Sequence, residues 1–209
     1  FSAFYKCPNL STVIVGDEVE TIPMFLFKNC SGITKLVLGS SLRKINGEAF
    51  DGCENLTEVN FPEGIAHIES FEECTNLQKI TLPESVTYIE GFRECASLHE
   101  VTIPKNVTYL NAFSYCEGIE IVNYNAADCD NNKSFFRCTN LKTLNIGSSV
   151  VTFDQGIGKE CPNLKYVNIA NGVTELKYYA FRDFVSIERL AIPASVTKIG
   201  VSAFRNCSG

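Results

Sequence analysis

The chain has 209 residues and a formal net charge of −6, and 45% of its residues are hydrophobic, so it can bury a sizeable core. Acidic and basic residues are interspersed, which argues against a nucleic-acid surface, because such a surface needs clustered Lys and Arg. No apolar run approaches the ~20 residues that a transmembrane helix needs, so no membrane span is expected in this segment.

One pattern recurs along the whole chain: F-x-x-C-x-x-L-x-x-V-x-I-P-x-x-V-x-x-L, repeated every 21–23 residues. Repeats of this length are typical of solenoids. The chain starts and stops within a repeat, so we interpret residues 1–209 as one repeat domain that is an excerpt of a longer array or multidomain chain. Nine turns start at Phe4, Phe27, Phe50, Phe71, Phe92, Phe113, Phe135, Gly158 and Phe181, and a tenth begins at Phe204.

Each repeat contains two apolar residues that alternate with polar ones, a period that predicts a short strand with one buried face. A Pro or Gly usually follows, as Pro104 does after Ile103, and ends the strand. Stacked repeats would pair these strands in parallel. The first apolar residue of each strand is Val13, Leu36, Val59, Ile80, Val101, Val122, Leu144, Val167 or Leu190.

A second apolar pair follows each strand, as in Val86 with Ile89, and we interpret it as an extended return segment. The Ala-Phe-x-x-Cys stretch then turns the chain, and we expect one turn of 3₁₀ or α-helix there. Three repeats between Phe50 and Ala112 have 21 residues, with the missing pair opposite the strand. This shortening predicts a tighter back and a local change of curvature.

Nine of the ten cysteines keep step with the repeat, which favours unpaired core thiols over a disulfide framework, because free Cys behaves as a small apolar residue. Occasional oxidation stays open, because neighbouring Cα atoms would be about 5 Å apart. Phe184 stands where a Cys is expected, Gly158 stands where a Phe is expected, and Cys129 lies off the series. The nine are Cys7, Cys30, Cys53, Cys74, Cys95, Cys116, Cys138, Cys161 and Cys207.

The polar positions of the strands form two outward rows, which are the candidate binding face. Tyr166 and Arg189 are residue types enriched at interfaces. Two structural alternatives stay open: charges that alternate between neighbouring strands from Lys35 to Glu100, and an Asn ladder between strands. The candidate ligand-binding residues are Lys35, Glu58, Asn60, Lys79, Thr81, Glu100, Thr102, Asn123, Asn145, Tyr166, Asn168 and Arg189.

The sixth repeat departs furthest from the pattern, with NAADCDNNKS after Tyr124 and no apolar return pair. Asp128, Asp130, Asn131 and Asn132 supply the hard oxygen ligands that calcium prefers. The stretch lacks the Gly and distal Glu of an EF-hand loop, so we predict an irregular surface loop without a metal. A long polar break in a regular solenoid is also a place where function tends to lie.

An enzyme is disfavoured. His67 and His99 are the only histidines, they occupy unrelated repeat positions, and no catalytic or nucleotide-binding motif is present. A Cys–His nucleophile would need a cysteine outside the core series, and Cys129 alone qualifies. We therefore expect neither catalysis nor a cofactor.

The repeat resembles the BspA-like subclass of the leucine-rich repeat family, most clearly in FDGCENLTEVNFPEGIAHI (50–68), FEECTNLQKITLPESVTYI (71–89) and FRECASLHEVTIPKNVTYL (92–110). The resemblance covers essentially the whole chain. It implies a right-handed coil of about nine repeats, with a parallel β-sheet on the concave face and short extended or 3₁₀ segments on the other side.

The resemblance also implies a cell-surface or secreted protein of a host-associated bacterium or trichomonad. Its implied role is adhesion to host matrix or to other cells, through a protein or glycan ligand and without enzymatic activity. Two alternatives remain: a structural spacer that presents another domain, and an intracellular scaffold.

Overall fold

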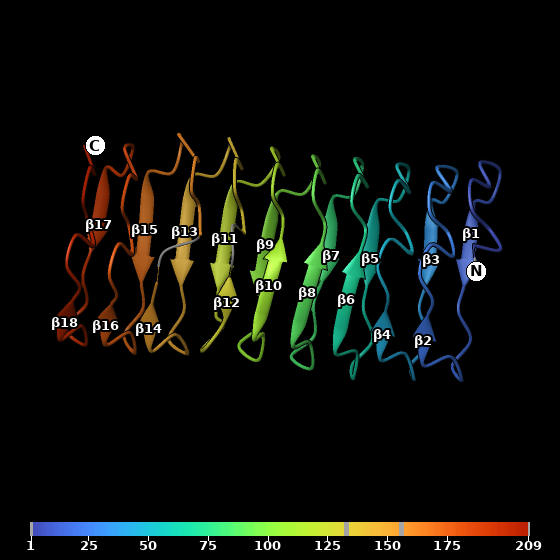
Figure 1. The fold of residues 1–209 in the computed structure, drawn as a ribbon, viewed down its shortest axis with the longest axis horizontal. Helices are drawn as coiled ribbons and strands as arrows, with labels where there is room; N and C mark the ends of the chain where they lie inside the picture. Colours follow the sequence, from blue (N-terminus) through green and yellow to red (C-terminus); the bar gives the residue numbers. More distant parts are fainter. Residues whose placement is uncertain (1, 132–133, 155–156, 209) are drawn as a thin grey trace.

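The computed structural model describes residues 2–131, 134–154 and 157–208, and these residues form short strands and turns without any helix. Figure 1 shows two rows of strands that extend along the length of the molecule; the strands lie across its long axis, and those of one row point in the opposite direction to those of the other. The first row holds the predicted strands, and the second row holds the predicted return segments. The solenoid expected from the repeat pattern, and the leucine-rich repeat coil that the resemblance implies, are therefore confirmed.

The first row contains nine strands among the described residues. They are separated by eight steps, so about eight full turns lie between the first and the last strand, slightly fewer than the nine expected. The strands are β1 (Thr12–Ile14), β3 (Lys35–Val37), β5 (Glu58–Asn60), β7 (Lys79–Thr81), β9 (Glu100–Ile103), β11 (Ile121–Tyr124), β13 (Thr143–Ile146), β15 (Tyr166–Ile169) and β17 (Arg189–Ala191).

The second row lies on the opposite side of each turn. Its strands are β2 (Thr21–Ile22), β4 (Lys44–Ile45), β6 (His67–Ser70), β8 (Tyr88–Gly91), β10 (Tyr109–Ala112), β12 (Asp130–Asn131), β14 (Thr152–Phe153), β16 (Glu175–Leu176) and β18 (Lys198–Ile199).

Pairing is parallel throughout, and it joins equivalent positions of successive repeats; Val122, for example, is in register with Val101 and Leu144. The hydrogen-bonded ladder is not continuous. The first row divides into the sheets β1-β3, β5-β7 and β9-β11-β13-β15-β17, and the second divides between β12 and β14. The sequence pattern repeats through these divisions and does not predict them.

The expected helical turn before each cysteine is wrong. Around Cys95 the chain makes a turn in which Glu94 has a φ of 62°. The backbone N–H of Glu94 donates to the carbonyl oxygen of Ser114 in the next repeat (3.0 Å), instead of to a residue four positions earlier. Because stacked repeats supply acceptors to these N–H groups, the segment needs no helix.

The 21-residue repeats have the tighter back that was predicted. β6, β8 and β10 have four residues each and run directly into the next Phe, whereas β2, β4, β16 and β18 have two and are followed by a turn. The φ angles of Phe71, Phe92 and Phe113 are 83°, 58° and 65°, so the backbone changes direction at the Phe residue. The change of curvature stays a prediction.

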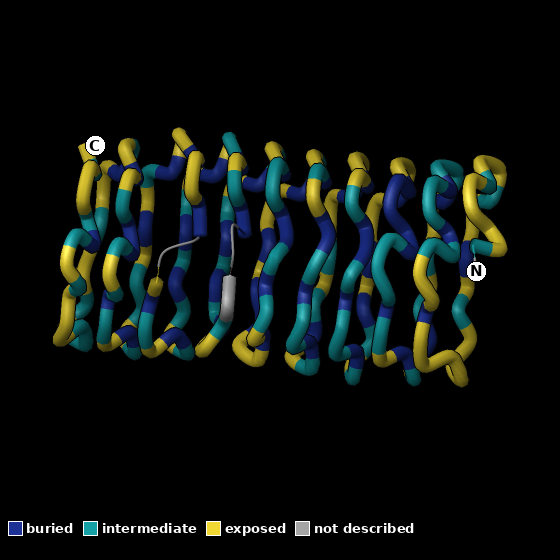
Figure 2. Tube along the Cα trace, in the orientation of Figure 1, coloured by how far each residue is buried: buried dark blue, intermediate teal, exposed yellow. Residues whose placement is uncertain are grey.

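The core lies between the two rows and extends along the solenoid. Rings from Phe4 to Phe135 stack one per repeat, with centroids 5.1–5.3 Å apart. No disulfide joins the cysteines of the described residues, and seven of them are buried, so the expected unpaired core thiols are confirmed. Figure 2 shows buried segments in every turn, with more exposed chain in the turns at both ends.

The sixth repeat keeps the path of the return strand in spite of its sequence. Asp130 is in register with Tyr109, and Asn131 with Leu110, so part of the expected irregular loop is a strand. Parallel pairing uses backbone groups, which every non-proline residue supplies, so it does not require an apolar side chain. Asn132 lies outside the described residues.

Candidate binding surface

The structure places all twelve predicted ligand-binding residues on first-row strands. Alternation puts their side chains outward: in β9, Val101 and Ile103 are buried, and Glu100 and Thr102 are exposed. Asn123 and Asn145 are half-buried, and the other ten residues are exposed. We call this set of side chains, from Lys35 to Arg189, the outward face.

The charged end of the outward face contains one of the expected cross-strand ion pairs. Nζ of Lys79 lies 3.1 Å from Oε1 of Glu58 on the neighbouring strand. A hydrogen bond from Lys79, and a weaker contribution from one with Asn60, lower the pKa of Glu58 below its ordinary value. Lys35 has no ion-pair partner among the described residues, and Glu100 accepts a hydrogen bond from Asn123 instead. Of the outward residues that alternate in charge, only Glu58 and Lys79 form an ion pair among the described residues, between β5 and β7.

The Asn ladder that the sequence left open is present. Nδ2 of Asn168 donates to Oδ1 of Asn145 (2.8 Å), and Nδ2 of Asn145 donates to Oδ1 of Asn123 (2.7 Å). Asn123 then donates to Oε1 of Glu100 (2.7 Å) and to Oγ1 of Thr102 (3.1 Å). An Asn amide carries two N–H donors, so Asn145 and Asn168 each keep one for a ligand.

A depression of about 660 Å³ lies on the outward face where no ladder hydrogen bonds join β7 to β9. Four predicted residues line it, and Gln78 and His99, which sequence reasoning did not propose as ligand contacts, line it as well. Gln78 and His99 each directly precede a first-row strand, and every repeat has a residue at that position. The sequence could therefore have singled them out only if the division of the ladder between β7 and β9 had been known. The predicted lining residues are Lys79, Thr81, Glu100 and Thr102.

The two predicted anchors lie side by side near the other end of the outward face. Tyr166 is in register with Arg189 across β15 and β17, and the side chain of Tyr166 is 44% exposed. The outward face thus combines a hollowed polar region, a chain of amides and an aromatic–guanidinium pair, and it can donate and accept hydrogen bonds along the strands from β7 to β17.

The acidic stretch of the sixth repeat forms no visible metal centre. Asp128 is exposed, and within the described ranges no three His, Cys, Asp or Glu side chains are close enough together to hold a metal ion. Nor does any helix of the described chain have the length and apolar character to cross a membrane.

Comparison with known families decides the assignment. The family described as "BspA type Leucine rich repeat region (6 copies)" matches residues 1–120 and 91–209, which together span the sequence. The chain belongs to the BspA-type leucine-rich repeat family. No curated protein matches it.

Two similar solved structures, both of leucine-rich repeat proteins, share the fold. One from Eubacterium ventriosum is 21% identical, with a TM-score of 0.64 over 96% of this chain and 59% of that one, so this chain spans less than two thirds of its length. A leucine-rich repeat protein of T. pallidum is 20% identical, with a TM-score of 0.54 over 94% of this chain and 76% of that one. A protein described as a leucine rich cell surface protein, from Faecalibacterium prausnitzii, is 23% identical, with a TM-score of 0.45 over 95% and 77%.

Proposed function

We propose that this chain is a non-catalytic binding module of a cell-surface or secreted protein, and that it binds a protein or glycan through the outward face, in an adhesive role. The observation that supports this most is the depression between β7 and β9, since four residues predicted from sequence meet there around a volume of about 660 Å³. Ligand pockets in proteins span roughly 300–1,000 Å³.

The chemistry of the outward face suits a polar ligand. Hydroxyl groups of Thr81 and Thr102, the ammonium group of Lys79 and the carboxylate of Glu100 surround the depression. The ammonium group donates hydrogen bonds, the carboxylate accepts them and the hydroxyls do both, so together they match sugar hydroxyls and peptide groups. The Asn ladder continues this hydrogen-bonding surface toward β15.

Tyr166 and Arg189 supply the kind of anchor that contributes most to the free energy of protein–protein binding. Their pairing across neighbouring strands puts an aromatic ring and a guanidinium group within reach of one partner segment. The proposed surface location rests on membership of the BspA-type family and on the resemblance to its adhesive members.

The test measures binding of the purified chain to arrays of extracellular-matrix proteins and of glycans. We expect saturable binding that falls at least tenfold in the variant Tyr166→Ala/Arg189→Ala and in the variant Lys79→Ala/Glu100→Ala. A matched control, Thr21→Ala/Lys198→Ala, changes two exposed residues of the second row and should bind like the unchanged chain. Equal saturable binding by all variants would contradict the outward face as the binding site, and no saturable binding at all would favour the spacer hypothesis.

A further inference from the structure

Two departures from the repeat, Gly158 and Phe184, coincide in space at neighbouring turns. A Cβ built on Gly158 would lie 3.2 Å from Cε1 of Phe184 and 3.3 Å from Cδ2 of Leu164. The Phe184 ring therefore takes part of the space that a Phe at position 158 would need. Phe153 of β14 fills another part, because it stacks on Phe181 with ring centroids 5.1 Å apart.

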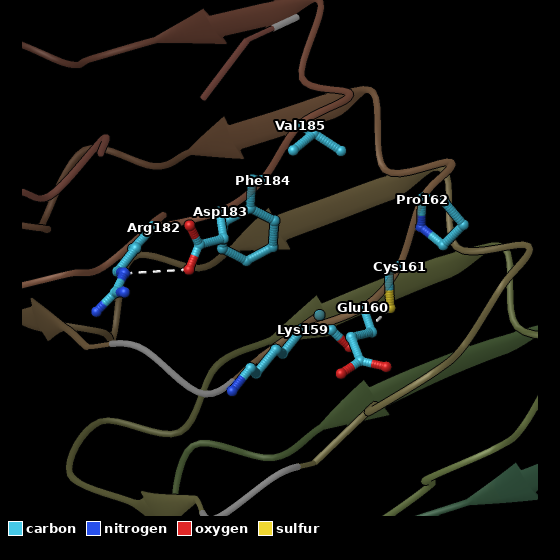
Figure 3. Close-up of a pocket in the computed structure, with 9 residues that line it drawn as sticks. Lys159, Glu160, Cys161, Pro162, Arg182, Asp183, Phe184 and Val185 are labelled. Carbon is cyan, nitrogen blue, oxygen red and sulfur yellow. Dashed lines mark hydrogen bonds and ion pairs between the residues drawn. The ribbon is translucent and has the colours of Figure 1, made fainter. Parts of the chain in front are cut away.

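This rearrangement leaves a pocket of about 490 Å³ between the turn at 158–162 and the turn at 182–185. Figure 3 shows Phe184 between the two turns, with Pro162 and Val185 near one end of the pocket and Lys159 and Arg182 toward the other. Val185 is 54% exposed, so an apolar side chain stands at the mouth. The volume and the mixed lining are those of a small-ligand site.

Most charges around the pocket are neutralised by a neighbour. Nε of Arg182 lies 3.0 Å from Oδ2 of Asp183, and Nε of Arg137 lies 2.8 Å from Oε2 of Glu160. Lys159 forms no ion pair within the described part of the chain. The lining thus carries one uncompensated positive charge, which favours an anion at the end where Lys159 lies.

We propose that this pocket binds an aromatic carboxylate, with the ring between Phe184, Pro162 and Val185 and the carboxylate at Lys159. An aromatic ring is favoured because it can pack against the Phe184 ring on one side and against the exposed side chain of Val185 at the mouth of the pocket. Two sources share this chemistry: a free aromatic acid, and an aromatic residue at the C-terminus of a partner peptide. The site is separate from the outward face and does not depend on the function proposed for it.

The test is a ¹H–¹⁵N NMR titration of the whole chain with N-acetyl-L-phenylalanine. We expect saturable shifts at residues 158–162 and 182–185, with a Kd on the order of 1 mM for a probe of this size. Val185→Trp should fill the mouth and abolish the shifts. The matched control is Val151→Trp, because Val151 is similarly exposed (52%) and lies outside the pocket.

The charge is tested by Lys159→Ala, which should weaken binding of the acid at least threefold and leave binding of N-acetyl-L-phenylalaninamide unchanged. Lys105→Ala, another exposed lysine, should change neither. Tighter binding of the peptide Gly-Ser-Gly-Phe than of the free acid would identify a peptide C-terminus as the ligand, and equal binding would identify a small acid. Absence of saturable shifts, or unaltered binding by Val185→Trp, would overturn the proposal.

Discussion

The thiol of Cys95 donates a hydrogen bond to the backbone carbonyl oxygen of Phe71, one repeat earlier, at 3.2 Å. The same bond recurs along the solenoid, so the cysteine position needs a residue that is small, apolar and able to donate. Cys meets all three requirements, which explains its regular spacing better than burial alone. The donors are Cys30, Cys53, Cys74, Cys95, Cys116, Cys138, Cys161 and Cys207.

Replacing Cys95 with Val should destabilise the chain by about 0.5–1.5 kcal/mol, because the buried carbonyl of Phe71 loses the thiol donor and keeps only the N–H of Cys74 (3.4 Å), while the apolar volume is kept. Cys95→Ser keeps a donor and should cost less. Urea unfolding followed by circular dichroism measures both free energies of unfolding. If Val proves as stable as Cys at this position, the hydrogen bond is not the reason for the cysteine.

Introducing the Phe of the repeat pattern at position 158 should destabilise the chain unless the Cys of the pattern is also introduced at position 184. Gly158→Phe should cost roughly 1–3 kcal/mol, because the new ring meets Phe184. The positive φ of Gly158 adds a backbone strain cost, but Phe71 and Phe92 adopt such a φ in their own repeats, and this cost is the same in both backgrounds. In a Phe184→Cys background the same change should cost less, with a coupling energy above about 1 kcal/mol in a double-mutant cycle. Additive effects would contradict the compensation.

Sequence reasoning succeeded where one physical rule repeats in each turn. Alternation around Val101 predicted the strand, its buried face and its parallel register. It failed where a neighbouring repeat supplies the interaction: the N–H of Glu94 finds an acceptor on Ser114, so the predicted helical turn is absent. Asp130 pairs as a strand through its backbone, although its side chain suggested a loop.

The candidate sites follow the same division. Side-chain alternation predicted which residues face outward, and the spacing allowed for the ladder from Asn168 to Asn123. The depression beside His99 arises where the hydrogen-bonded ladder divides, and the pocket at Gly158 arises from how three aromatic rings repack. The depression depends on where the ladder divides, and the pocket depends on how the side chains of neighbouring turns meet, so neither can be read from the sequence of a single repeat.

Asp51 should make the chain less stable as pH rises. Burial raises the pKa of Asp51 to about 6, and the N–H of Glu72, which donates to its Oδ1 (3.0 Å), offsets this only in part. A folded-state pKa above the usual 3.8 means that the contribution is full below about pH 4 and is lost as pH rises through 6.

Asp51→Asn keeps an acceptor oxygen and removes the buried charge, so at pH 7.5 it should raise the free energy of unfolding by about 1–3 kcal/mol. Thermal unfolding between pH 4.5 and 7.5 measures the difference, which should shrink toward the acid end. Asp17→Asn is the control, because hydrogen bonds from Ser40 lower the pKa of Asp17 and its replacement should not stabilise. A pH-independent effect at position 51 would contradict the burial argument.

The core thiols should be inert in the folded chain. Burial raises the pKa of Cys53 and of Cys161 to about 12, so almost no thiolate forms there at pH 8. We expect a thiol-reactive dye to label the partly exposed Cys7, Cys129 and Cys207 promptly, and the seven buried cysteines only as the chain unfolds. All ten should react in concentrated guanidinium chloride. Prompt labelling of more than three in the native chain would contradict the packed column of thiols.

The most direct test of the functional account is protease shaving of intact source cells, because a binding module for external ligands must face outward. Peptides of this chain released from living cells, detected by mass spectrometry with a cytosolic marker protein absent, are the predicted result. Peptides found only after lysis would contradict the account, and the solenoid would then have to be pursued as an intracellular scaffold.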